Sequence, residues 1–227
     1  MRRLSMLGTA LAVAALFLLG NSAAFAAPSP EENQLIDRAA VTVQHMRQDP
    51  AFDRARAQLR SAKGVLVVPA LVKGGFIFGA EGGNGVLMQR NADGWSPPAF
   101  YTLASASFGL QAGLEQAEVV MLVMSDKALD AIKRSEFKLG AGGGITVVTL
   151  SAGAEVGVTA PNVTADIIVW QSGTGVYGGI TLNGSVIKAR DEWNTAFYGR
   201  RVDVSDILGA RVRNPEADRL RQQLATL

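Results

Sequence analysis

The spacing of apolar residues predicts two amphipathic helices within residues 27–63. Ser29 and Glu32 match a capping box at the start of the first helix. Asp49 followed by Pro50 predicts the start of the second, because aspartate caps helices and proline suits the first helical position. In each helix the apolar residues recur on one face, which is typical of packing against a core. Those faces are Leu35, Ala39, Val43 and Met46, then Phe52, Ala55 and Leu59.

Residues 64–190 are predicted to be mainly β-structure, with glycines inside the strands. An apolar run of valines and Leu66 ends at Pro69, which has no N–H for a strand ladder. The next segment, 76–88, is interrupted by Gly79, Gly82, Gly83 and Gly85. Glycine inside a strand indicates a bulge, a bend or a close backbone approach, and a curved sheet needs all three. The alternative is a flexible glycine loop, but the apolar residues on both sides favour an ordered strand.

Turn and capping residues divide the rest of the chain. The pattern predicts a turn at 91–94, strands over 95–110, 119–124 and 167–170, and a second glycine-rich β region over 140–158. Asn183-Gly184 predicts a type I′ hairpin turn. One short helix is expected from Ser125 or Asp126, and residues 191–227 form a helical C-terminus. The fold class is therefore α+β: a curved, glycine-rich antiparallel sheet closing toward a barrel, flanked by N-terminal and C-terminal helices.

Residues 1–26 have the features of a secretory signal peptide. Arg2 and Arg3 are followed by an apolar run, and Ala24-Phe25-Ala26 matches a signal peptidase site. We therefore expect export by the Sec route, with residues 27–227 forming a single domain in the periplasm or outside the cell. The chain contains no cysteine, so the domain folds without disulfides.

The charge pattern disfavours nucleic acid and draws attention to one basic row. Lys and Arg number 22 and Asp and Glu 20, and the excess is Arg2 and Arg3, so the mature chain would be neutral. Arg56, Arg60 and Lys63 follow the helical spacing i, i+4 and i+7 beside the apolar stripe of the second helix. Such a row is either a solvated surface or, next to an exposed aromatic ring, a contact for membrane lipid.

Four long strings of the chain together resemble the SYLF domain family. They are AKGVLVVPALVKGGFIFGAEGGNGVLMQR, GWSPPAFYTLASASFGLQAG, VVMLVMSDKAL and GVYGGITLNGSVIKARDEWNTAFYG, which span most of the mature chain. The resemblance implies binding to membrane lipids, phosphoinositides in eukaryotic members, and actin binding in some fungal members. It implies no catalytic residues, and it places lipid contact on the N-terminal amphipathic segment.

Motifs for catalysis and cofactor binding are incomplete. Residues 173–178 match G-x-G-x-x-G, but strand and hairpin residues follow where a dinucleotide site needs a helix. Ser135 and Lys138 match S-x-x-K without its partner motifs, and His45 is the single histidine. We therefore expect no enzyme activity, no metal and no cofactor.

The function expected from the sequence is binding of anionic, phosphoinositide-like lipid head groups in the bacterial cell envelope. Arg56, Arg60 and Lys63 would supply the electrostatic contact, and Phe52 would be an apolar anchor. Two alternatives stay open at this point: a scaffold that binds another envelope protein, and a carrier that holds a small apolar ligand inside the sheet.

Overall fold

The structure is a computed structural model that describes most of the domain. It describes residues 30–75, 78–108, 113–134, 136–139, 144–151, 165–174, 182 and 184–226. The predicted signal peptide, and all of the second glycine-rich region except residues 144–151, lie outside these ranges.

Six α-helices and nine strands are found in the described residues. The helices are α1 (Pro30–Gln48), α2 (Pro50–Leu59), α3 (Asp126–Lys133), α4 (Asp191–Tyr198), α5 (Val204–Leu208) and α6 (Asp218–Ala225), with a 3-10 turn η1 (Pro215–Ala217). The strands are β1 (Gly64–Gly75), β2 (Phe78–Asn91), β3 (Gly94–Trp95), β4 (Ala99–Phe108), β5 (Gly113–Val123), β6 (Glu136–Lys138), β7 (Val147–Ser151), β8 (Ile167–Thr174) and β9 (Val186–Ala189). The predicted helix starts at Pro30 and Pro50 are confirmed, as is the helix capped by Ser125, whose Oγ accepts the Ala128 N–H at 3.2 Å.

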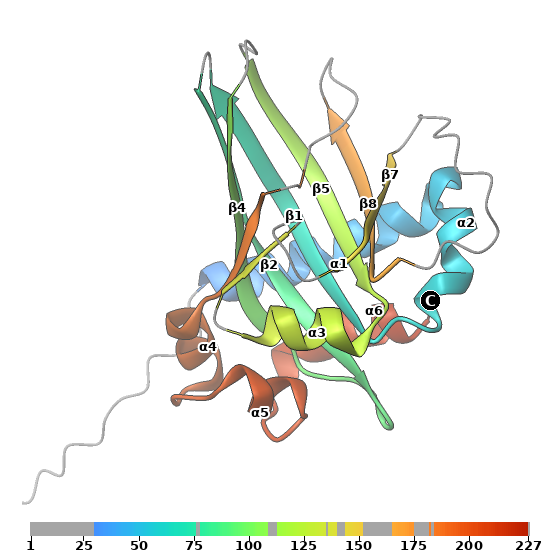
Figure 1. Cartoon of the computed structure of the whole chain (residues 1–227). Helices are drawn as coiled ribbons and strands as arrows, with labels where there is room; N and C mark the ends of the chain where they lie inside the picture. The colour runs from blue at the N-terminus through green and yellow to red at the C-terminus, as the bar shows by residue number, and fades with distance from the viewer. Residues whose placement is uncertain are drawn as a thin grey trace, which may run out of the picture.

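All the strands lie in one curled sheet, a half-barrel with helices on both faces (Figure 1). Its strand order is β6-β9-β4-β2-β1-β5-β8-β7, with β3 paired to β2. The pairings are antiparallel except for β7 with β8, which run parallel. The prediction of an α+β fold with a curved sheet closing toward a barrel is confirmed.

Two glycines of β2 lie where a bulge in β1 passes close to them. The register of β1 shifts between Val67 and Val72 against β2, around the proline that cannot donate to the ladder. A Cβ added to Gly83 would lie 2.4 Å from the carbonyl oxygen of Ala70, and one added to Gly85 would lie 2.6 Å from that of Val67. The prediction of a close backbone approach is confirmed here, since any larger residue would collide with β1.

Side chains of the sheet alternate between two cores. On the face covered by α1, α2 and α6, here called the α1 face, Val65 and Val67 are buried with Phe100 and Trp170. The opposite face, here called the α3 face, buries Leu66 beneath α3 and α5. Because helices cover both faces at this position, the strands carry continuous apolar runs there rather than an alternating pattern.

One predicted strand is interrupted. The strand expected over 95–110 is divided, because Pro97 and Pro98 separate β3 from β4. The predicted turn at Asn183-Gly184 is closed by the Ser185 N–H, which donates to the carbonyl of Leu182 at 3.0 Å. β9 pairs with β4 and β6, and of the strand expected before the turn only Leu182 is among the described residues. Gly184 does have the expected positive φ of 88°, and Asn183 lies outside the described residues.

Candidate functional site

The start of α2 is fixed to the sheet by its capping residue. The carboxylate of Asp49 accepts a hydrogen bond from the indole Nε1 of Trp170 at 2.8 Å, and its carbonyl accepts the N–H of Phe52 at 3.0 Å. Trp170 lies on β8 and is itself buried in the α1-face core. This anchor turns the apolar stripe of α2 toward the sheet.

Phe52 is a core residue and does not present its ring to a lipid. Its side chain is fully buried, with Leu59 of the same helix, in the α1-face core. The expectation that Phe52 lies at the surface as an apolar anchor is therefore wrong. The hydrogen bond between Asp49 and Trp170 holds the start of α2 against the sheet, so that Phe52 points into the core. The helical spacing of α2 alone does not reveal this contact with a distant strand.

The basic row does not share a helical face. α2 ends at Leu59, and the following residues form turns in which Ser61 and Ala62 donate to the carbonyls of Gln58 and Leu59. The expectation that the second helix reaches residue 63 is therefore wrong. Arg60 and Lys63 are both exposed, on the segment between α2 and β1. The backbone of Arg56 lies in α2, and its side chain is outside what the structure describes.

Arg90, which the sequence analysis missed, holds this segment in place. Its guanidinium donates to the carbonyl of Ala62 at 3.1 Å and to that of Leu59 at 3.0 Å, and it stacks over the ring of Trp95 at 4.2 Å. The Arg90 N–H also donates to the carbonyl of Lys63 at 2.8 Å. Burial lowers the pKa of Arg90 from its ordinary value, but a guanidinium remains charged. Arg90 therefore satisfies carbonyls at the C-terminal end of α2 and fixes the backbone from which Arg60 and Lys63 project.

Only a weak sequence signal points to this role of Arg90. Arg90 closes the apolar run of β2, and Trp95 follows across the tight turn at 91–94. Cation–π pairing across such a turn is a recurrent arrangement, but the carbonyls that Arg90 meets are about thirty residues away in the chain.

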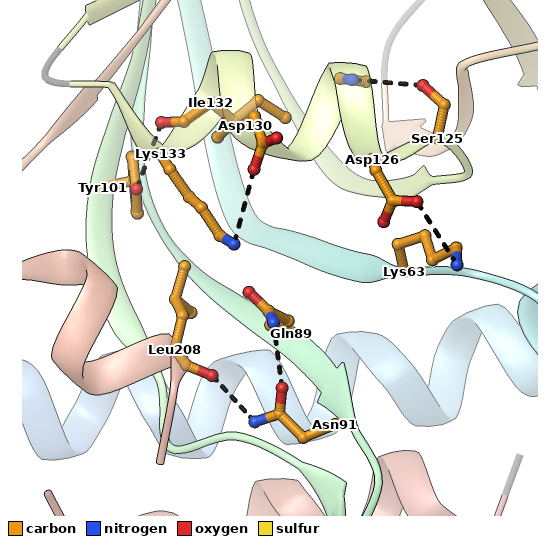
Figure 2. Close-up of polar contacts among 11 residues, drawn as sticks. Lys63, Gln89, Asn91, Tyr101, Ser125, Asp126, Asp130, Ile132, Lys133 and Leu208 are labelled. Carbon is orange, nitrogen blue, oxygen red and sulfur yellow. Dashed lines mark hydrogen bonds and ion pairs between the residues drawn. The ribbon is translucent and has the colours of Figure 1, made fainter. Parts of the chain in front are cut away.

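Lys63 is held only loosely by the nearest carboxylate. Its Nζ lies 3.6 Å from Oδ2 of Asp126, in the first turn of α3, and the two side chains are 49% and 74% exposed (Figure 2). Exposed pairs of this kind contribute about 0–1 kcal/mol. An anionic group from outside can therefore replace Asp126 at little cost in free energy.

The single histidine contacts a carboxylate rather than a reactive group. Nδ1 of His45 lies 2.9 Å from Oε2 of Glu118, and Thr42 donates to Oε1 of the same carboxylate at 2.7 Å. These contacts attach α1 to β5. Within the described ranges there is no group of three or more His, Cys, Asp or Glu residues that could hold a metal ion. No helix in the same ranges is long and apolar enough to cross a membrane.

Comparison with known proteins identifies relatives for most of the domain. A family model described as "Las17-binding protein actin regulator", Ysc84, matches residues 104–227. The chain is 33% identical over 165 residues to Protein YSC84 of Saccharomyces cerevisiae, covering 70% of this chain and 34% of that protein. It is 32% identical over 165 residues to the yeast LAS seventeen-binding protein 3, covering 70% of this chain and 35% of that protein.

A human relative gives a similar match. The SH3 domain-containing YSC84-like protein 1 is 30% identical over 152 residues, covering 66% of this chain and 44% of that protein. The match therefore spans about a third to under half of the relatives' own length. No solved structure matches the chain. The family model covers more than half of the chain, and the chain therefore belongs to the Ysc84 family, the SYLF domain family.

Proposed function

We propose that the chain binds anionic phospholipid at a membrane surface, without catalysing a reaction, through the segment between α2 and β1. The observation that carries the proposal is the exposure of Arg60 and Lys63 on a backbone fixed by Arg90. Arg56, one helical turn before Arg60, would add a third cation. A binding role fits the family, whose description names binding and regulation.

The strength of such a contact follows from simple electrostatics. Each Lys or Arg close to an anionic membrane surface contributes about 1 kcal/mol, so three would contribute about 3 kcal/mol. The attraction is screened within about 10 Å at 0.1 M salt, so binding should weaken as salt is added. Because Phe52 is buried, the contact would be electrostatic and peripheral, with no aromatic ring inserted from α2.

The membrane in question depends on export. If residues 1–26 act as a signal peptide, the mature chain would be in the periplasm or outside the cell and would meet an envelope lipid surface. The relevant head groups would then be the anionic phospholipids of that envelope.

A second candidate is a scaffold that binds an envelope protein. It is favoured by the names of the relatives, one of which is called a LAS seventeen-binding protein. A protein partner would read the shape of the surface as well as its charge, so its binding should respond less steeply to salt than binding to vesicles.

Vesicle co-sedimentation of the mature chain tests the proposal. We expect binding to vesicles of phosphatidylcholine and phosphatidylglycerol, and little binding to phosphatidylcholine alone. Changing Arg56, Arg60 and Lys63 to Glu should weaken binding by about a hundredfold or more. The matched control changes three exposed cations elsewhere, Arg38, Lys138 and Lys188, to Glu.

The control should bind almost as wild type does. Both variants should melt near the wild-type temperature, because Arg60, Lys63 and the three control residues are exposed. Wild-type binding by the Arg56/Arg60/Lys63 variant at low salt would contradict the site. Absence of vesicle binding by the wild type, with capture of an envelope protein from a membrane extract, would favour the scaffold.

A further inference from the structure

A second basic surface is formed by the two segments that flank α5. Val202 before the helix and Val212 after it are both buried in the α3-face core. Their neighbours in the chain are exposed arginines, because the buried valines turn the adjacent side chains outward. These arginines are Arg200, Arg201, Arg211 and Arg213.

A hydrogen bond brings the two segments together. The amide Nδ2 of Asn214 donates to the carbonyl of Phe197, in the last turn of α4, at 2.7 Å. Gly199 caps the end of α4 with a left-handed φ of 65°, and Arg200 follows directly. The hydrogen bond therefore links the residue after Arg213 to the helix turn that precedes Arg200.

Most of the positive charge here is not neutralised within the protein. Arg211 pairs with Asp206 at 2.7 Å. The guanidinium groups of Arg200, Arg201 and Arg213 form no ion pair or hydrogen bond with any part of the chain that the structure describes. We call these three residues the arginine cluster. Asp203 is the one further carboxylate between residues 199 and 214.

The arginine cluster and the α2–β1 segment lie at the same end of the molecule. The N–H of Arg90 bonds to Lys63, while the side chain of its neighbour Asn91 donates to the carbonyl of Leu208, the last residue of α5, at 2.9 Å. The end of β2 therefore contacts both the α2–β1 segment and the end of α5, and Figure 2 shows the bond from Asn91 to Leu208. Figure 1 shows α3, α5 and the start of β1 together at the lower end of the sheet, which we call the helical end.

The opposite end differs in charge. There the end of β1 and the start of β2 pair with each other and extend beyond the helices in Figure 1, and we call this the strand-tip end. Lys73 of β1 lies in register with Glu81 on one side and Glu115 on the other. The strand-tip end thus has two carboxylates beside this lysine. The helical end has two groups of exposed cations, which outnumber the exposed carboxylates beside them, Asp126, Asp130 and Asp203.

We propose that the arginine cluster is a second lipid contact, and that the helical end as a whole docks on an anionic bilayer with the strand-tip end directed away from it. This inference rests on the proposed function and adds the orientation. A bilayer fits because it presents many anionic head groups in one plane, which two separate basic surfaces can contact together. A single soluble phosphate group would reach one surface at a time, without the gain from simultaneous contacts.

Charge-reversal variants measure the contribution of each basic surface to vesicle binding. Arg200→Glu, Arg201→Glu and Arg213→Glu together should weaken binding to mixed phosphatidylcholine and phosphatidylglycerol vesicles by about a hundredfold. The control variant of Arg38, Lys138 and Lys188 changes charge equally and should bind nearly as wild type. Wild-type binding by the arginine-cluster variant, with loss in the Arg56/Arg60/Lys63 variant, would overturn the second contact and leave the proposed function standing. Binding unchanged in both variants would overturn both sites.

Orientation has a test that does not depend on charge variants. The chain has no cysteine, so a single one can be introduced and labelled with a fluorophore. Ser205→Cys on α5 and Ala80→Cys on β2 are both at exposed positions, one at each end. With quencher-bearing lipids in the vesicles, fluorescence should fall strongly for Ser205→Cys and little for Ala80→Cys. Equal quenching, or stronger quenching at Ala80→Cys, would overturn the proposed orientation.

Discussion

The two halves of β1 show how one strand can serve two different environments. In the first half, Val65 to Val68 are all buried, since α1 covers one face of the sheet and α3 the other. In the second half, beyond the bulge, Val72 is 39% exposed and the next residue is Lys73. The continuous apolar run gives way to Lys73, Gly74 and Gly75 at the point where the helices stop covering the sheet.

The strand-tip half is stabilised by polar contacts across the sheet. The hydroxyl of Ser105 donates to the buried carboxylate of Glu81, which lies next to Lys73 in the β1–β2 register. A buried carboxylate needs such partners, because its desolvation is otherwise costly. The helical half relies instead on apolar burial from both faces. Because the strands are buried on both faces there, the helical half forms a fixed support for the basic residues at its end.

The largest expected effect comes from removing an apolar side chain at the helical end. Phe52→Ala should lower the free energy of unfolding by about 3–5 kcal/mol, since it leaves a cavity in the α1-face core. Urea unfolding followed by circular dichroism measures this. Val72→Ala, at an exposed position on the strand-tip half, is the control and should change stability by no more than about 0.5 kcal/mol.

The same variant separates the two interpretations of Phe52. If the ring is part of the core, the remaining folded protein should bind vesicles as wild type does. A wild-type unfolding midpoint with weakened vesicle binding would show that the ring contacts lipid, and would contradict the burial described here.

A smaller effect is expected at the bulge that separates the two halves. Gly83→Ala places a Cβ 2.4 Å from the carbonyl oxygen of Ala70, so the backbone of β1 must shift, at a cost of about 1–3 kcal/mol. Gly82→Ala is a matched control one residue away, because the nearest atom to its Cβ would be the Leu103 carbonyl oxygen at 3.9 Å. Equal unfolding midpoints for the two variants would mean that β1 is not bulged against β2 as described.

What could be predicted from the sequence was local. As expected, α2 starts at Pro50, directly after Asp49, and Ser125 caps α3. Capping residues are recognisable in the sequence because they act within a few residues. The clustered glycines predicted a close approach, although not that Gly83 would face the carbonyl of Ala70.

What failed depended on contacts between distant segments. Phe52 points inward because Asp49 bonds to Trp170, and Arg90 becomes important because the end of α2 lies beside β2. β9 pairs with β4 and β6, and its local sequence does not identify either partner. No periodicity in a single segment contains this information, so the basic residues could be identified while their arrangement could not.

The smallest expected effect concerns a carboxylate at the helical end. The pKa of Asp166 is held below its ordinary value, first by a hydrogen bond from the Ser125 hydroxyl and then by the backbone N–H of Thr146 at 2.9 Å. A depressed pKa means that the charged form stabilises the fold above the unfolded-state pKa, and that this contribution is lost as pH falls through the folded-state value. The loss should therefore appear on the acid side of about pH 4.

Thermal unfolding measured across that pH range tests this contribution. Asp166→Asn should lower the melting temperature slightly at neutral pH, and its difference from wild type should shrink as the medium becomes more acidic. Asp130→Asn, an exposed aspartate on α3, is the control, and its difference from wild type should change less with pH. The effect should be small because Asp166 is close to solvent, where water weakens hydrogen bonds to a carboxylate. A difference between Asp166→Asn and wild type that stays constant down to the most acidic condition would show that Asp166 does not link α3 to the start of β7 through its charge.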